Sequence, residues 1–311
     1  MTNLELVFPE IFLSLSIMFL LILGVFKKNS SKLILNISVI ILLIGAVITF
    51  NETLGIGEVK LFNGSIVIDY LASFMKIITL LSAFLVLLVS SNYLKLLNIF
   101  KIEYPILILS SVLGMMIMIS SNDLIVFYMG LELQSLALYV LATFDRDKIK
   151  SSEAGLKYFV LSALSSGLLL YGCSLIYGFT GSTNFNEIAN QLNSNEYALT
   201  FGIVFILVGL AFKISAVPFH MWAPDVYEGS PTSVTLFFTM VPKIAALTVF
   251  IRFLYVPFLN LIDQWQMIIV FLSIASMLFG AIAAIGQTNI KRLVAYSSIG
   301  HIGYTLAGLA T

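Results

Sequence analysis

Long, uninterrupted apolar runs restrict the fold of this chain more than any other feature. About 20 helical residues cross a hydrocarbon layer of about 30 Å, since each residue adds about 1.5 Å. Runs of this kind fall roughly at 6–26, 33–50, 69–91, 105–121, 123–143, 152–178, 198–217, 232–256, 264–286 and 291–310. Only 10% of the 311 residues are charged, whereas soluble domains carry about 25%. The sequence therefore predicts an all-α polytopic membrane protein with about ten transmembrane helices.

The positions of lysine and arginine predict the orientation, because these residues concentrate in loops on the inner side. The first run lacks a basic leader and a cleavage site, so we expect it to remain as a helix. With the N-terminus outside, the outer loops hold Lys60 and Arg252. The inner loops then hold Lys27, Lys28, Lys32, Lys95, Lys101, Arg146, Lys148, Lys150, Lys291 and Arg292. This asymmetry predicts an outer N-terminus and two long outer loops, 51–68 and 179–197.

Composition also excludes several functions. Sixteen basic and sixteen acidic side chains cancel, which argues against a nucleic-acid partner. Cys173 is the one cysteine and His220 and His301 are the two histidines, so we expect no disulfide, iron–sulfur cluster, haem or zinc site from this chain alone. The sequence has no phosphate-binding or dinucleotide-binding glycine motif. We therefore expect no cofactor in this chain.

Five ionisable residues remain within the expected spans: Lys76, Glu132, Lys157, Lys213 and Lys243. A lysine at a helix centre costs about 2.5–3.5 kcal/mol on insertion scales. We expect Lys76 to snorkel towards the outer interface, because it lies only two turns into its helix. Lys157 lies near the inner end of its span and can snorkel in part. The other three lie deeper, and they form either structural ion pairs or a proton relay.

Two prolines are candidate helix breaks next to these lysines. Pro218 follows Lys213 near the end of its apolar run, and Pro242 directly precedes Lys243. Broken backbone within a membrane is tolerated where it is buried in protein or lines a hydrated cavity. The pattern favours a hydrated, ionisable site around Lys213. His301 is a possible further relay group, and His220 is either a relay group or an interfacial packing residue.

Three motifs resemble one known family. "FKISAVPFHMWAPDVYEGSPT", "VPKIAAL" and "TNIKRLVAYSSIGHIGYTLAG" resemble the antiporter-like membrane subunits of respiratory complex I (NADH:quinone oxidoreductase). Within that group, "PDVYEGSPT" is similar to the subunit 2 family, called chain N in bacteria. The related L and M chains and the Mrp cation/proton antiporter subunits share the Lys–Pro–His–Trp–Pro–Asp frame but differ after it.

The resemblance implies an antiporter-like fold of two inverted five-helix repeats, each with one broken helix. On this chain it implies an N-terminal three-helix segment at 1–104, a complete first repeat at 105–257 with its break near Pro218, and the start of a second repeat at 258–311. Glu132 would be the acid of the first half-channel and Lys213 its partner. Lys157 would be the linking lysine, and Lys243 the central lysine that passes the proton onward.

The resemblance also implies a function. The chain would be a proton-translocating subunit of the NADH:quinone oxidoreductase enzyme, without a redox centre. NADH, FMN, iron–sulfur clusters and quinone would belong to partner subunits. The expected neighbours are the antiporter-like chain M (subunit 4), the small membrane chain K (subunit 4L) and membrane lipid. The membrane would be the bacterial inner membrane or the mitochondrial inner membrane.

Two alternatives remain open: an Mrp-type sodium/proton antiporter subunit and a structural scaffold with paired buried charges. The family implies about fourteen helices and this chain has about ten expected spans. We therefore expect a C-terminally short fragment or a chain completed by another polypeptide.

Overall fold

The computed structural model describes residues 4–27, 30–53, 57–191 and 196–311, and Lys28 lies outside them. The described residues form twelve α-helices and one two-stranded β-hairpin. The first six helices are α1 (Phe8–Phe26), α2 (Ser31–Thr53), α3 (Tyr70–Leu96), α4 (Glu103–Ile119), α5 (Leu124–Ala142) and α6 (Ile149–Thr180). The others are α7 (Phe185–Asn190), α8 (Glu196–Ile214), α9 (Trp222–Gly229), α10 (Thr232–Tyr255), α11 (Ile262–Ile285) and α12 (Ile290–Ala310).

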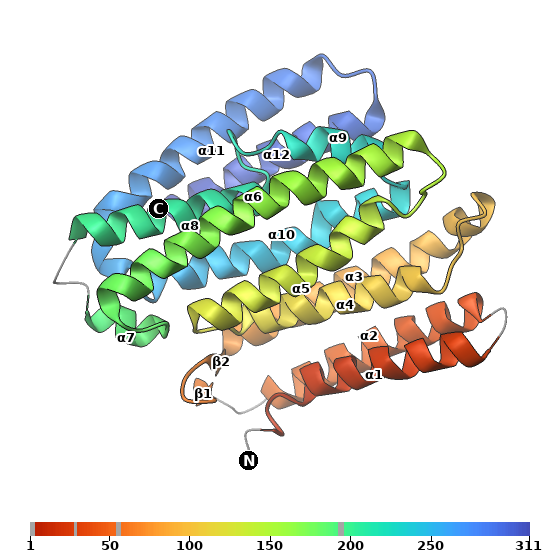
Figure 1. Cartoon of the computed structure of the whole chain (residues 1–311), viewed down its shortest axis with the longest axis horizontal. Helices are drawn as coiled ribbons and strands as arrows, with labels where there is room; N and C mark the ends of the chain where they lie inside the picture. The colour runs from red at the N-terminus through yellow and green to blue at the C-terminus, as the bar shows by residue number, and fades with distance from the viewer. Residues whose placement is uncertain (1–3, 28–29, 54–56, 192–195) are drawn as a thin grey trace.

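The long helices lie side by side in one bundle. In Figure 1, α1 and α2 form one edge of the bundle and α11 lies at the opposite edge. The most extensive contacts between helices are those of α11 with α12, α4 with α5, and α6 with α8. Glycines make two of these approaches possible: a Cβ on Gly114 of α4 would lie 2.5 Å from the Gln134 nitrogen of α5, and one on Gly172 of α6 would lie 2.7 Å from the Gly202 oxygen of α8.

Each of the ten expected spans coincides with a long helix, so the prediction of a helical, multispanning membrane protein is confirmed. Among the described residues, eight helices are long and apolar enough to cross a membrane: α1, α2, α3, α5, α6, α8, α10 and α11. Helix α4 is also apolar but has only 17 residues. Helix α12 is not among the eight, and its first turn contains Lys291 and Arg292.

The two expected outer loops contain secondary structure. Strands β1 (Val59–Leu61) and β2 (Ile66–Ile68) pair antiparallel. Phe62, Asn63 and Gly64 turn the chain between them with positive φ angles, which asparagine and glycine accept more readily than other residues. The second loop contains α7, which begins after the N-cap Asn184. The hairpin and α7 were not predicted, because neither contains a long apolar run.

The helical conformation is interrupted between α8 and α9. Helix α8 ends at Ile214 and α9 begins at Trp222, with Pro218 between them. The Trp222 indole Nε1 donates to the Phe212 carbonyl at 2.9 Å, and the Val217 backbone nitrogen donates to Ser276 Oγ at 2.9 Å. The Ser276 contact satisfies a backbone nitrogen that the interruption would otherwise leave unpaired inside the protein, and the Trp222 contact joins α9 to the last turn of α8.

The prediction of a helix break at Pro242 is wrong, because Pro242 lies inside α10, a continuous helix of 24 residues. Proline lacks an N–H, so the carbonyl four residues earlier, on Phe238, loses its usual helical partner. The Tyr227 hydroxyl donates to this carbonyl at 3.2 Å. A neighbouring side chain thus supplies the missing hydrogen bond, and the helix does not need to open.

Candidate functional site

Lys213 lies at the end of α8 in a buried polar site, which we call the Lys213 site. Its ammonium Nζ donates to Ser135 Oγ of α5 and to Ser162 Oγ of α6, each at 2.7 Å. The Tyr139 hydroxyl donates to the same Ser162 oxygen at 2.6 Å, and Lys213 Nζ lies 5.9 Å from the centre of the Tyr139 ring. Only 7% of Lys213 is exposed. Three helices therefore hold one buried ammonium with hydroxyl groups.

Glu132 belongs to the Lys213 site without touching its ammonium. It lies on α5, three residues before Ser135. Its carboxylate interacts electrostatically with Lys213 and with Tyr139. Glu132 Oε1 is buried and has no hydrogen-bond partner among the described residues. The acid and the base that the sequence singled out thus share one site, with serine and tyrosine hydroxyls around the base.

Lys243 lies in a second buried site, which we call the Lys243 site. Only 6% of the residue is exposed. Its Nζ donates to Ser298 Oγ of α12 and lies 5.8 Å from the centre of the Tyr227 ring. A cavity of about 380 Å³ extends from Lys243 along α10 and α12 and is also lined by His301. The structure therefore brings Lys243 and His301 to one cavity.

His220 lies apart from these groups, in the connection between α8 and α9. It is 8% exposed, and its ring packs 4.5 Å from the ring of Phe279 on α11. Its Nδ1 has no hydrogen-bond partner among the described residues. The contact with Phe279 agrees with the packing alternative, and the unpaired nitrogen keeps the relay alternative open.

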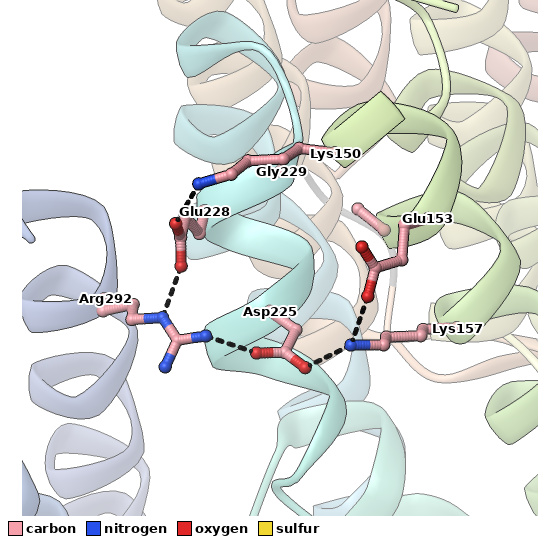
Figure 2. A pocket seen from close by; sticks show the side chains of 8 residues that line it. Lys150, Glu153, Lys157, Asp225, Glu228, Gly229 and Arg292 are labelled. Carbon is pink, nitrogen blue, oxygen red and sulfur yellow. Dashed lines mark hydrogen bonds and ion pairs between the residues drawn. The ribbon is translucent and has the colours of Figure 1, made fainter. Parts of the chain in front are cut away.

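Lys157 belongs to neither buried site. Its Nζ contacts Asp225 and Glu153, each at 2.8 Å, and 42% of its side chain is exposed. Figure 2 shows it as part of a charge cluster made by α6, α9 and α12. The members of this charge cluster are Lys150, Glu153, Lys157, Asp225, Glu228 and Arg292. The structure thus places Lys157 at an open cavity of about 190 Å³, away from Lys213.

Arg292 connects the two acids of α9 within the charge cluster. Its Nη2 donates to Asp225 at 2.7 Å and its Nε donates to Glu228, as drawn in Figure 2. The Lys150 ammonium donates to Glu228 at 3.0 Å. The Arg292 guanidinium, and then the Lys150 ammonium, lower the pKa of the Glu228 carboxyl. These contacts fix α9 between α6 and α12.

The expectation for Lys76 is wrong. Lys76 is 4% exposed and does not snorkel, because its Nζ donates to Glu10 Oε1 of α1. Glu52 of α2 interacts electrostatically with both. Neither acid was predicted as a partner, although Glu10 lies inside the first apolar run and Glu52 lies two residues after the second. An acidic residue at the edge of an apolar run was the feature of the sequence that could have indicated a partner for Lys76.

The Lys213 site has the groups that proton transfer requires. A serine hydroxyl both donates and accepts a hydrogen bond, so it can receive a proton on one side and release one on the other. A lysine and a carboxylate that interact electrostatically change protonation together. The site can therefore hold a proton on Lys213 and release it when the charge of Glu132 changes.

Comparison with known proteins gives one consistent family. Residues 121–311 match the family described as NADH:quinone oxidoreductase/Mrp antiporter, TM. The chain is 72% identical over 311 residues to NADH-quinone oxidoreductase subunit N of Pelagibacter ubique (strain HTCC1062), covering 100% of this chain and 66% of that protein. It is 54% identical over 310 residues to the protein of the same name from Rhodospirillum rubrum, covering 97% and 63%. The chain thus spans about two thirds of the length of these relatives.

Solved structures have the same fold. A chain of respiratory complex I from Thermus thermophilus with bound Aureothin superposes with a TM-score of 0.83 at 30% identity, over 97% of this chain and 64% of that chain. A chain of the Mrp complex from Dietzia sp. DQ12-45-1b superposes with a TM-score of 0.86 at 24% identity, over 100% and 59%. The second likeness concerns the fold alone.

Proposed function

The chain belongs to the NADH:quinone oxidoreductase/Mrp antiporter transmembrane family, and from this premise we propose that it translocates protons as part of the membrane arm of NADH:quinone oxidoreductase. The observation that carries the proposal is the Lys213 site, in which two serine hydroxyls hold a buried ammonium and the buried Glu132 Oε1 has no hydrogen-bond partner among the described residues. Buried ionisable groups are costly in a membrane protein, and those that are present mark ion pathways and proton relays. Electron transfer in other subunits supplies the driving force.

Each ionisable residue has its own part in the proposed path. Glu132 and Lys213 form the acid–base pair of the first half-channel, and Lys243 passes the proton towards the second half. His301 extends the path beyond Lys243, since both line one cavity. Lys157 contributes through the charge cluster, which joins α6 to α9 and α12, and His220 remains a candidate group at the interruption between α8 and α9.

The proposal also includes the finer architecture. Residues 1–104 form the N-terminal three-helix segment, 105–257 the first five-helix repeat, and 258–311 the start of an inverted second repeat. The interrupted helix α8–α9 is the broken helix of the first repeat. The N-terminus lies on the outer side of a bacterial or mitochondrial inner membrane.

The partners are proposed on the same basis. Chains M and K are the membrane neighbours, and NADH, FMN, iron–sulfur clusters and quinone are bound by other subunits. The two curated relatives compared above are both named NADH-quinone oxidoreductase subunit N, whereas the likeness to the Mrp complex is limited to the fold. This difference favours complex I over the antiporter alternative.

The test uses Lys213→Ala in the complete native complex, with Lys60→Ala as the control. Lys60 is an exposed lysine of the hairpin, paired only with Glu58 among the described residues. We expect Lys213→Ala to lower proton pumping coupled to quinone reduction several-fold, while NADH oxidation by an artificial acceptor is unchanged. Normal pumping in the assembled variant would refute the proposal. A parallel loss of both activities, with normal assembly, would also refute it.

A further inference from the structure

A second group of ionisable side chains lies outside the proposed path, in the first three helices. We call Glu10, Glu52 and Lys76 the N-terminal triad. They come from α1, α2 and α3 respectively. Glu10 lies near the start of α1, Glu52 near the end of α2 and Lys76 seven residues after the N-cap of α3. The three residues therefore lie towards the end of the bundle that bears the β-hairpin.

The contacts within the N-terminal triad are unequal. Lys76 Nζ donates to Glu10 Oε1, and both residues are buried, with 4% and 7% exposed. The other carboxylate oxygen, Glu10 Oε2, is buried and has no hydrogen-bond partner among the described residues. Glu52 is only partly buried, and it interacts electrostatically with Glu10 and Lys76. One ammonium thus serves two carboxyl groups.

Other charged groups near this end of the bundle already have contacts of their own. Asp69 accepts two hydrogen bonds from Arg252, and Glu58 pairs with Lys60 at the exposed hairpin. Glu5 precedes α1 and also has an interaction. The charged residue at the start of α4, Glu103, lies at the opposite end of the bundle from the hairpin. None of these described groups supplies the triad with a second cation.

The charge count decides the state of the triad. With both carboxyl groups ionised, the triad carries one uncompensated negative charge around a buried oxygen atom. An isolated charge of this kind is strongly disfavoured, and the group takes up a proton instead. We propose that Glu10 and Glu52 hold one proton between them, so that the N-terminal triad is a neutral, proton-exchanging site.

Glu52 is the group of this site that exchanges the proton with water, because it is only partly buried. Glu10 Oε2 is the acceptor that the proton can reach within the site. The triad lies on α1–α3, whereas the Lys213 and Lys243 sites are formed by α5, α6, α8, α9, α10 and α12. The inference therefore does not rest on the function proposed for those sites.

The experiment labels protonated carboxyl groups with dicyclohexylcarbodiimide in the complete native complex. The acid proton moves to one carbodiimide nitrogen while a carboxylate oxygen bonds to the central carbon, and the adduct rearranges to a stable N-acylurea. Mass spectrometry of peptides then gives the labelled fraction of each glutamate. The decisive comparison is Glu52 in the wild type and in Glu10→Gln, because the access of the reagent to Glu52 is the same in both.

We expect Glu10→Gln to lower the labelling of Glu52 at pH 7 by about tenfold or more, because Lys76 then pairs with Glu52, and an ordinary glutamate is almost fully ionised at this pH. Glu52→Gln should lower the labelling of Glu10 in the same way. This second variant changes a half-exposed side chain, where we expect little effect on assembly. Glu58→Gln is the control and should change neither. Labelling of Glu52 that is unchanged or higher in Glu10→Gln, or of Glu10 in Glu52→Gln, would overturn the proposal.

Discussion

Ser162→Ala is the change that tests the Lys213 site most directly. Ser162 Oγ accepts hydrogen bonds from Lys213 Nζ at 2.7 Å and from the Tyr139 hydroxyl at 2.6 Å. A hydrogen bond to a charged group contributes about 1.5–3 kcal/mol. Since about 1.4 kcal/mol equals a factor of ten, the loss should reduce the ratio of charged to neutral Lys213 roughly ten- to a hundredfold. Ser135 remains as the second acceptor, so the site should weaken without collapsing.

The assay is proton pumping by the reconstituted complex, measured as protons per NADH oxidised over a range of pH. Because the variant holds its proton less tightly, pumping should fail at a pH about 1 to 2 units lower than in the wild type. Ser166→Ala is the matched control, since Ser166 lies one turn further along α6, is 4% exposed, and its Oγ has no hydrogen-bond partner among the described residues. Equal pH profiles for the two variants would refute the assignment of Ser162 as a group that holds the Lys213 proton.

Two further predictions concern packing and the charge cluster. Gly114→Ala should destabilise the protein by about 1–3 kcal/mol in thermal unfolding in detergent, because its Cβ would lie 2.5 Å from the backbone of α5. The control is Gly167→Ala, whose Cβ meets nothing within 4 Å among the described residues; it should cause no loss of stability and a gain of up to about 1 kcal/mol, because alanine favours a helix interior over glycine. Arg292→Gln should cost about 1 kcal/mol or less, because the pair is partly exposed. Because the pKa of Glu228 is lowered in the folded protein, the stabilisation is fully present at pH values above the ordinary glutamate pKa of 4.5. It is lost as the pH falls through the lower pKa of the folded protein. The difference in melting temperature should therefore be constant near neutral pH and shrink under acid conditions, and a difference that grew in acid would contradict the assignment.

The sequence predicted the helices well, because spanning a hydrocarbon layer leaves a chain little choice. Backbone groups must pair within each segment, so an apolar run of sufficient length becomes a helix. The ends also follow local rules: Asp123 accepts hydrogen bonds from the first backbone nitrogens of α5, and Asn289 does the same for α12. These signals lie within a few residues of each other, which is why they can be found without a structure.

The partners of the buried charges could not be predicted, because they come from distant parts of the chain. Ser135 and Ser162 lie 78 and 51 residues from Lys213, and serines in apolar helices are too common to indicate a site. Lys76 and Glu10 are 66 residues apart, so distance from the interface alone favoured snorkelling. Only the packing of helices decides which polar residues meet.

The three buried lysines differ in what receives their hydrogen bonds, and this difference separates their roles. Lys76 donates directly to a carboxylate oxygen of Glu10, so its ammonium is compensated by an opposite charge within the N-terminal triad. Lys213 contacts two hydroxyl groups and feels its carboxylate only electrostatically, while Lys243 contacts a single hydroxyl group beside a cavity. A hydroxyl group satisfies an ammonium without neutralising it, so a change in a nearby charge can displace the proton. Lys213 and Lys243 are therefore suited to pass protons on, whereas Lys76 anchors a site in which the carboxyl groups exchange the proton.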